Sequence, residues 1–154
     1  YFESLLGFMR DVRFERLGVF TYSKEDGTKA GAMASQLTDE QKEERRERAM
    51  ALQLGISREI AAAQVGQTKR VLVEKQADAE ELRQAKMSSW EHGHIRSGEG
   101  SGVVDIGPCL IARGEADAPD IDGRVLVRGD LPLGQFADVR ITGHTDYDLI
   151  AEPI

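Results

Sequence analysis

The chain has 154 residues, of which 40% are hydrophobic and 31% are charged, and its formal net charge is -7. This composition is typical of a soluble globular protein with one ordinary core or two small ones, and it argues against a disordered chain. Cys109 is the only cysteine, which excludes an internal disulfide and a metal or iron–sulfur site built from cysteines of this chain alone. No apolar run reaches the roughly 18 residues of a membrane span, and we find no secretory leader, so we expect a cytoplasmic location without membrane contact.

The first 37 residues predict a short helix followed by a strand. Apolar residues recur at three- and four-residue steps, at Phe2, Leu5, Leu6, Met9 and Val12. The run 17–22 is rich in β-branched and aromatic residues and ends in a turn-forming segment, which predicts a strand. A helix and a buried strand make half of an α/β unit. Because no partner strands are found downstream, we expect them before residue 1 and interpret the chain as a fragment.

Tyr22 and Ser23 lie at the end of this predicted strand. Ligands of α/β sheets gather at the carboxyl ends of strands, so the pair is a candidate for the border of a binding site. An ordinary turn is the competing interpretation.

A long helix is predicted over residues 39–64. Thr38 and Gln41 match the capping box, in which each side chain bonds the backbone amide of the other residue. Gly55 lies in the middle of the predicted helix, where glycine costs about 1 kcal/mol relative to alanine. The charged segment 42–48 is most simply a solvated face.

From Thr68 the hydrophobic period changes to that of strands. Five short runs bounded by Gly, Pro and Asp predict strands at Thr68–Glu74, Cys109–Arg113, Arg124–Val127, Phe136–Thr142 and Asp148–Glu152. Their number and spacing predict a small antiparallel, OB-like β-barrel. The fold class is therefore α+β, and we place the boundaries between the helix–strand segment, a connector helix and the barrel at residues 1–37, 38–66 and 67–154.

An insertion at about residues 75–108 separates the first two predicted strands. Its 78–87 part predicts a helix, and its glycine-rich 96–102 part predicts a flexible loop. The glycines do not lead into the Gly-Lys-Ser/Thr signature or into a helix start, so a phosphate-binding loop is not supported.

His92 and His94 would place two imidazoles on one side of a strand within this insertion. Glu91 or Cys109 could add a third metal ligand. Because a catalytic zinc normally uses three protein ligands that are held rigidly, we favour an exposed loop over a metal site. No nucleophile elbow and no histidine held by a carboxylate is indicated, so hydrolase chemistry has no support.

The acidity of the chain is concentrated in its second half. Residues 1–66 carry 10 basic and 11 acidic side chains, whereas residues 67–154 carry 10 basic and 16 acidic side chains. One stretch of this half has no Lys or Arg between Arg113 and Arg124 and contains the acidic residues Glu115, Asp117, Asp120 and Asp122. A surface of one sign there would repel phosphate and attract a basic protein. A solvated loop without a partner is the alternative.

Four arginines of the predicted barrel keep a second function open. They are Arg113, Arg124, Arg128 and Arg140. OB-like barrels bind RNA through Lys, Arg and exposed aromatic residues, and outside the insertion this barrel has only Phe136 and Tyr147 as aromatics. RNA binding is therefore disfavoured unless the fold brings the four arginines to one face, and a non-catalytic RNA-binding module stays the alternative.

Several stretches carry a resemblance to a known family. They are 14–28, the long helix with 44–45 and 50–53, and the barrel stretches 116–123 and 146–153. Residues 14–28 resemble the last strand and turn of the catalytic barrel of the radical SAM methylthiotransferases. The long helix resembles their connector, and the two barrel stretches resemble their TRAM domain. The resemblance covers nearly the whole chain except about 75–108, and the acidic Ala-Asp-Ala-Pro stretch favours the branch that modifies a ribosomal protein over the tRNA-modifying relatives.

The resemblance implies a C-terminal portion of an S-adenosylmethionine-dependent enzyme that methylthiolates an aspartate of ribosomal protein S-twelve. It implies two [4Fe–4S] clusters in the full-length protein, but the cysteines that hold them are absent here, so we expect this chain to be inactive alone. Substrate docking is the role it could retain, as a monomer, with Glu115, Asp117, Asp120 and Asp122 facing the basic ribosomal protein. Tyr22 and Ser23 would then border the active-site end of the catalytic barrel. A truncated product without independent function is a third possibility.

Overall fold

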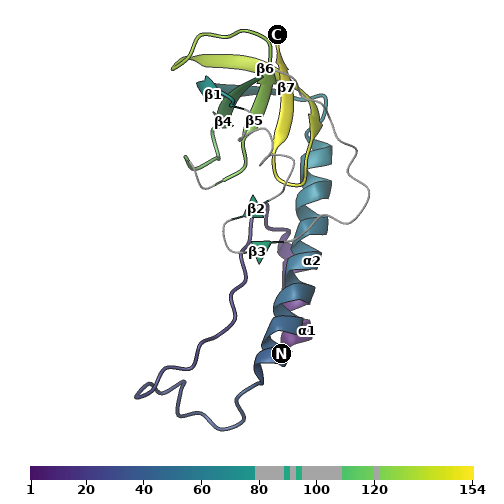
Figure 1. Ribbon diagram of the computed structural model, residues 1–154. Coiled ribbons are helices and arrows are strands. Elements are labelled where there is room, and N and C mark those ends of the chain that lie inside the picture. Colours follow the sequence, from purple (N-terminus) through teal and green to yellow (C-terminus); the bar gives the residue numbers. More distant parts are fainter. Residues whose placement is uncertain (79–88, 91–92, 95–108, 120–121) are drawn as a thin grey trace. The chain divides into compact units, whose positions relative to one another are not determined.

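The computed structural model describes residues 1–78, 89–90, 93–94, 109–119 and 122–154 (Figure 1). Its elements are α1 (Phe2–Val12), α2 (Asp39–Ala63), β1 (Thr68–Gln76), β2 (Ser89–Trp90), β3 (Gly93–His94), β4 (Cys109–Gly114), β5 (Val125–Arg128), β6 (Phe136–His144) and β7 (Leu149–Pro153). In the described part of the chain, no helix combines the length and the apolar character that crossing a membrane requires.

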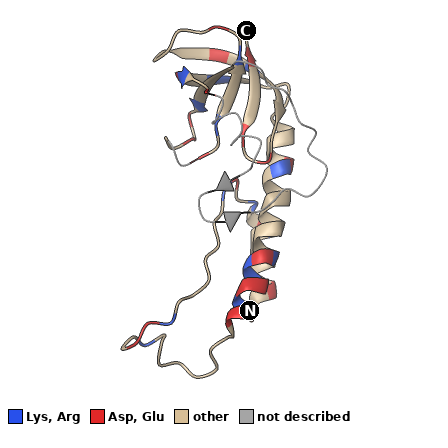
Figure 2. Ribbon diagram, in the orientation of Figure 1, with Lys and Arg blue, Asp and Glu red and all other residues tan. Residues whose placement is uncertain are grey.

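The predicted capping box forms at the start of α2. The Thr38 amide donates to Gln41 Oε1 at 3.1 Å, and the Gln41 amide donates to Thr38 Oγ1 at 3.3 Å. These reciprocal bonds satisfy two of the amides that a helix start leaves without partners. The helix ends at Ala63, one residue before the predicted end, and acidic and basic residues crowd its first half (Figure 2).

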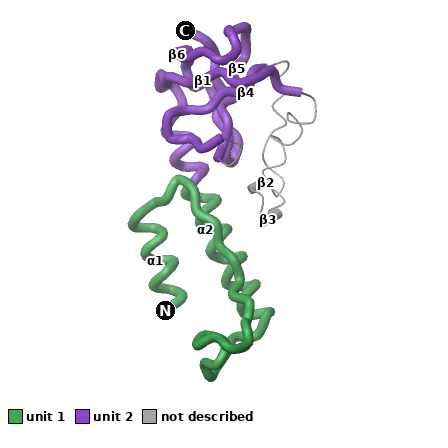
Figure 3. Tube along the Cα trace, turned by 90° about the vertical axis from the view of Figure 1, so that its left-hand side faces the viewer, with its two compact units in different colours: residues 1–56 green, residues 57–154 purple. Residues whose placement is uncertain are grey.

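The chain divides into two compact units, Tyr1–Ile56 and Ser57–Ile154 (Figure 3). The division falls inside α2, so this helix belongs partly to each unit.

In the first unit, α1 packs on α2 through a small apolar cluster. Its buried members are Leu6, Met9 and Ala49, and Phe2, Leu17, Val19 and Leu52 pack around them. The predicted helix is thus confirmed, but only part of its apolar face is covered, since Leu5 and Val12 are 44% and 46% exposed.

The first half of α2 is more than the solvated face that its charge pattern predicts. The guanidinium groups of Arg45 and Arg48 lie 5.4 and 5.0 Å from the centre of the Phe2 ring, and Arg48 is also ion-paired with Glu3. A cation over an aromatic face is attracted by the negative potential of the ring. Part of the charged surface of α2 therefore holds α1 in place.

The predicted strand over residues 17–22 is not formed. Leu17 and Val19 pack on the cluster of the first unit, whereas Phe20 and Tyr22 are exposed. An extended segment becomes a strand only when a neighbour completes its backbone hydrogen bonds, and no described segment pairs with this one. The predicted helix–strand pair is therefore a helix followed by an irregular segment.

The second unit contains a closed five-stranded barrel. The strand order is β1-β4-β5-β7-β6, and β6 pairs back on β1. Each predicted strand is present, with ends within two residues of the prediction, so the α+β class and the barrel are confirmed. Alternating side chains of all five strands fill the interior, namely Val71, Val73, Leu110, Ala112, Val125, Val127, Val139, Ile141 and Ala151.

The barrel is not fully antiparallel as predicted. Four neighbouring pairs of strands are antiparallel, but β5 and β7 run parallel. After β5 the chain passes to β6, and the β6–β7 hairpin then lays β7 between β6 and β5. Because the hairpin reverses the chain once more, β7 runs in the direction of β5.

Most of the predicted insertion lies outside the described residues. This holds for the predicted helix over 78–87 apart from Asp78, for the predicted loop over 96–102, and for His92. The strands β2 and β3 form a two-residue antiparallel pair. The metal hypothesis for His92 and His94 depends on side chains outside the described part.

Candidate functional site

The β4–β5 connection carries the acidic residues of the docking hypothesis, and we call residues 115–122 the acidic loop. Glu115, Asp117 and Asp122 are described, whereas Asp120 lies outside the described residues. Since β4 and β5 pair antiparallel, the acidic loop turns the chain between two neighbouring strands of the barrel.

Two aspartates hold the described part of the acidic loop in shape. Asp117 Oδ2 accepts a hydrogen bond from the Gly114 amide, and Asp122 Oδ2 accepts one from the Ala118 amide, both at 2.8 Å. Aspartates that bond nearby backbone amides in this way stabilise turns. Both are half-buried, whereas Glu115 is exposed. The loop thus combines two roles, because Asp117 and Asp122 shape it and Glu115 is presented to solvent.

The four arginines of the RNA-binding hypothesis do not share one pair of neighbouring strands. Arg113 on β4 donates from Nε to Glu74 Oε1 at 2.7 Å, and Arg140 lies on β6 in register with a glutamate of β7. Arg124 directly precedes β5, and Arg128 is the last residue of β5, which is not a neighbour of β6. Arg124 Nη1 and Arg128 Nε are buried, and neither finds a hydrogen-bond partner in the part of the chain that is described.

A different arginine stacks on an exposed aromatic ring. The Arg70 guanidinium lies 5.1 Å from the centre of the Phe136 ring, and Phe136 is 64% exposed. The two residues lie on β1 and β6, far apart in the sequence, and the pairing that closes the barrel brings them together. The sequence pattern of either strand alone does not indicate this pair.

Tyr22 and Ser23 lie in the exposed, irregular segment that follows α1. The Lys42 ammonium lies 5.9 Å from the centre of the Tyr22 ring. The strand-end argument does not apply to them, because the strand is not formed. Their place at an active-site border stays a prediction from the resemblance.

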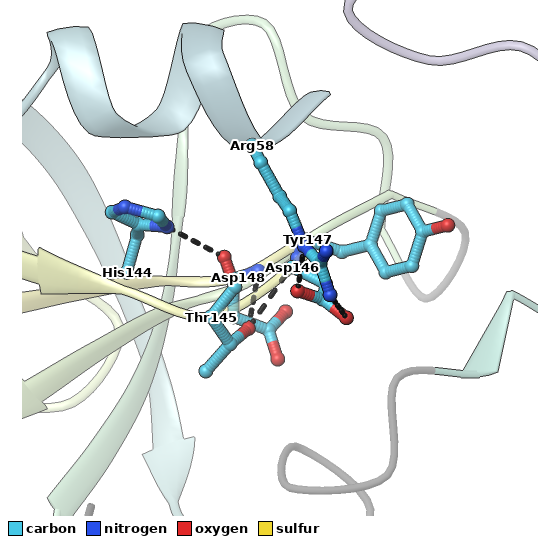
Figure 4. A network of polar contacts seen from close by, with 6 residues as sticks. All are labelled: Arg58, His144, Thr145, Asp146, Tyr147 and Asp148. Carbon is cyan, nitrogen blue, oxygen red and sulfur yellow. Dashed lines mark hydrogen bonds and ion pairs between the residues drawn. The ribbon is translucent and has the colours of Figure 1, made fainter. Parts of the chain in front are cut away.

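A network of polar contacts that the sequence did not indicate lies at the β6–β7 turn (Figure 4). Asp146 is 8% exposed, and its carboxylate accepts hydrogen bonds from Arg58 Nε at 2.6 Å and from Nη2 at 3.1 Å. Figure 4 shows the Arg58 side chain reaching from α2 to this carboxylate, while the Tyr147 ring points away from it. The hydrogen bond to Asp146 raises the pKa of Arg58, and burial, with a further contribution from Asp146, raises the pKa of Tyr147. The one available signal was that Arg58 is the only basic residue between Arg48 and Lys69.

Further hydrogen bonds stiffen the same turn. Thr145 Oγ1 accepts from the Asp148 amide at 2.9 Å, and the Thr145 amide donates to the Asp148 carbonyl at 2.8 Å. Asp148 Oδ1 accepts from the Arg124 amide at 2.8 Å, which ties the turn to the start of β5. Asp146 is therefore presented to Arg58 from a turn that is held on several sides.

Cys109 does not fit the ligand set of an iron–sulfur cluster. Its side chain is buried in a second apolar cluster with Ile111, Leu126 and Ile150. A [4Fe–4S] cluster takes the thiolates of several cysteines, and this chain has one. Among the residues that the structure describes, no group of three or more His, Cys, Asp or Glu is placed to hold a metal ion.

Comparisons with known proteins agree with this architecture. Residues 102–154 match the family model of the TRAM domain. The chain is 44% identical over 151 residues to the ribosomal protein uS12 methylthiotransferase RimO of Opitutus terrae, which covers 98% of this chain and 25% of that protein. Proteins of the same name from Heliobacterium modesticaldum and Desulforudis audaxviator are 37% and 41% identical, over 99% and 97% of this chain and 27% of each relative.

The chain spans about a quarter of the length of the relatives that it matches. The matches confirm the resemblance to the methylthiotransferases and the TRAM assignment. With a match to the TRAM domain model over residues 102–154 and similarity over nearly all of its length, this chain is similar to the C-terminal part of the RimO methylthiotransferases.

Proposed function

We propose that this chain is the substrate-docking portion of a RimO-like methylthiotransferase and that its acidic loop binds the ribosomal protein uS12. The observation that carries the proposal is the loop itself, in which Asp117 and Asp122 hold the backbone and Glu115 is left exposed. The names of the relatives support the choice of uS12 as the protein that is bound.

The charge of the barrel region supports a basic partner. Residues 67–154 carry 16 acidic against 10 basic side chains, whereas ribosomal proteins use basic surfaces to bind RNA. Opposite charge speeds the encounter of two proteins and sets their orientation more than it raises their affinity. Salt screens such contacts over about 8 Å at physiological ionic strength, so the proposed binding is salt-dependent.

In the full-length protein, the groups that carry out the reaction would be held by residues outside this chain. Two [4Fe–4S] clusters and S-adenosylmethionine would supply the radical and sulfur-transfer chemistry, as the resemblance implies. Since Cys109 is buried and is the only cysteine, the cluster ligands must come from elsewhere, and we predict that this chain alone is inactive. We place the full-length protein in the cytoplasm, where ribosomal proteins are made.

The proposal is tested by titrating this chain with purified uS12 at several salt concentrations. We expect Glu115→Lys to weaken binding about fivefold at low salt, because it reverses one exposed charge and leaves the aspartate hydrogen bonds intact. Asp120→Lys tests a second member of the loop.

Asp130→Lys is the matched control, because Asp130 is an exposed acid outside the acidic loop and its reversal changes the net charge equally. Equal weakening by Glu115→Lys and Asp130→Lys would mean that only net charge matters. Unchanged affinity of both loop variants at low salt would reject the docking role.

The Arg70–Phe136 pair favours RNA binding as a second candidate function. Surfaces that bind single-stranded nucleic acid combine exposed aromatic rings, on which bases stack, with arginine. If the chain binds single-stranded RNA in a parallel titration, Phe136→Ala should weaken that binding and leave uS12 binding unchanged. A preference of the unmodified chain for RNA over uS12 would replace the docking proposal by this one.

A further inference from the structure

The last two turns of α2 are attached to the barrel at two points. The Arg58 side chain binds Asp146 in the β6–β7 turn. Just beyond the helix, the Gly66 amide donates to the Ile141 carbonyl at 2.8 Å, and the Ile141 amide donates to the Gln67 carbonyl at 2.9 Å. Arg58 lies about 7.5 Å before the end of α2 at a rise of 1.5 Å per residue, and Gly66 lies beyond that end. Because the two attachments are separate points, we expect this end of α2 not to pivot on the barrel.

Gly55 precedes these attachments and has no packing role. It lies inside α2, is exposed, and a Cβ added there would meet nothing within 4 Å. Alanine would therefore fit and would stabilise the helix, because glycine has the lowest helix propensity of all residues except proline. The boundary between the two compact units lies one residue after Gly55, between Ile56 and Ser57.

Glycine is conformationally permissive, and glycine–serine pairs are among the places where helices kink. Gly55 is followed by Ser57 after a single residue. Because the segment after Gly55 is attached to the barrel by side chain and backbone, bending is expected at Gly55 and not at the end of the helix.

We propose that Arg58 is a positioning residue, which holds the segment 57–67 to the barrel through its ion pair with Asp146. The segment, the barrel and the acidic loop then move as one body. This body reorients relative to the part of the chain before Gly55, which serves as the pivot. The use of this motion rests on the proposed function, since it would bring a docked uS12 to the reacting part of the full-length protein. Domain motions about a few hinge residues serve this purpose in many enzymes.

The first test measures distances and needs no substrate. Nitroxide labels are placed on cysteines introduced at the exposed positions Ala51, Ala62 and Asp130, in a Cys109→Ala background, and pulsed electron paramagnetic resonance gives the distance distributions. We expect the 62–130 distribution to be narrow and the 51–130 distribution to be broad, because only the second pair spans Gly55.

The variants then separate the roles of Arg58 and Gly55. Arg58→Gln should broaden the 62–130 distribution, Arg58→Lys should largely restore it, and Gly55→Ala should narrow the 51–130 distribution. Arg46→Gln is the matched control, since Arg46 is also an ion-paired arginine of α2 but its partner, Glu43, lies on the same helix. An unchanged 62–130 distribution in Arg58→Gln would overturn the positioning role, and an unchanged 51–130 distribution in Gly55→Ala would overturn the pivot.

The second test uses the full-length protein and its uS12 substrate. Misplacement of a bound substrate by a small distance costs turnover, so we expect Arg58→Gln to lower kcat/KM about tenfold while the affinity of this chain for uS12 stays unchanged. A loss of affinity equal to the loss of kcat/KM would assign Arg58 to docking and overturn positioning. If the chain does not bind uS12 at all, the proposed function fails, whereas the distance measurements still decide the pivot.

Discussion

Gly129 shows how much one residue can matter to the closure of the barrel. It follows β5 directly and adopts a φ of 113°, in the range that side chains disfavour. A Cβ at this position would lie 3.2 and 3.3 Å from the Cγ and Cδ atoms of Pro153, in β7. Backbone conformation and space therefore both require glycine where the chain leaves β5.

We predict that Gly129→Ala lowers the free energy of unfolding by about 2 kcal/mol, because it adds backbone strain and a clash with a rigid proline ring. Gly7→Ala is the matched control. Gly7 lies inside α1 with nothing within 4 Å of an added Cβ, so alanine there should stabilise by about 1 kcal/mol. Urea-dependent hydrogen exchange of the barrel amides in Gly129→Ala and of the α1 amides in Gly7→Ala measures the two effects, and a change of the same sign in both would contradict the argument.

The residues of the acidic loop mark a limit of prediction from sequence. The sequence places four acidic side chains in a short stretch without a basic residue, and that much of the candidate site was predictable. The turn that the β4–β5 pairing imposes decides which of these side chains bond backbone amides. The roles of Asp117 and Asp122 in shaping the loop were therefore not predictable from the sequence. The Arg58–Asp146 and Arg70–Phe136 contacts join segments that are far apart in the sequence, so no local sequence pattern predicts them.

At the scale of elements, the first turns of α2 are stabilised by charge. A hydrogen bond from Lys42 lowers the pKa of Asp39, and one from Arg46 lowers the pKa of Glu43, from ordinary values of 3.8 and 4.5. A carboxyl group whose pKa is lower in the folded state stabilises that state above its unfolded pKa, and this stabilisation is lost as the pH falls through the folded pKa. The acidic first turn also suits the positive end of the helix dipole.

We therefore predict that the helix content of the chain falls in acid, starting as the pH drops below the ordinary carboxyl values of 4.5 and 3.8. Far-ultraviolet circular dichroism from neutral pH downward measures it. The Asp39→Asn, Glu43→Gln double variant should start with less helix and show a flatter pH dependence, because the titrating pairs are gone. Identical pH profiles of the two proteins would refute this role.

Elements with a strong local period were predictable, and those that depend on neighbours were not. The capping box and the long helix are local patterns, and the five barrel strands alternate or run apolar between clear turn signals. The run 17–22 has the composition of a strand but no described partner, and composition alone cannot supply one. The parallel pairing of β5 and β7 depends on the order of the strands around the barrel. The hydrophobic period of a single strand does not indicate this order.

At the scale of the whole molecule, the two compact units are held by different forces. In the barrel every strand is hydrogen-bonded on both sides, around a core shared by all five strands. In the first unit, α1 is held by a small apolar cluster and by arginines stacked on Phe2. Cooperative units of this kind open with separate free energies.

We predict that native-state hydrogen exchange detects two units. The amides of β1, β4, β5, β6 and β7 should become exchangeable together, and those of α1 should do so at a lower denaturant concentration. Phe2→Ala should lower the opening free energy of α1 by about 1 kcal/mol or more and leave the strand amides unchanged. A single opening free energy for α1 and the strands would show that the chain unfolds as one body.

The position of β7 has a consequence for the making of this protein. β7 lies between β5 and β6 and is hydrogen-bonded to both, yet residues 149–153 are the last of the barrel to be synthesised. Until they emerge, β5 and β6 present two unpaired edges, which are templates for joining other chains. A premature stop codon before Leu149 would leave both edges exposed permanently. We therefore expect the shortened protein to aggregate rather than to fold into a working barrel.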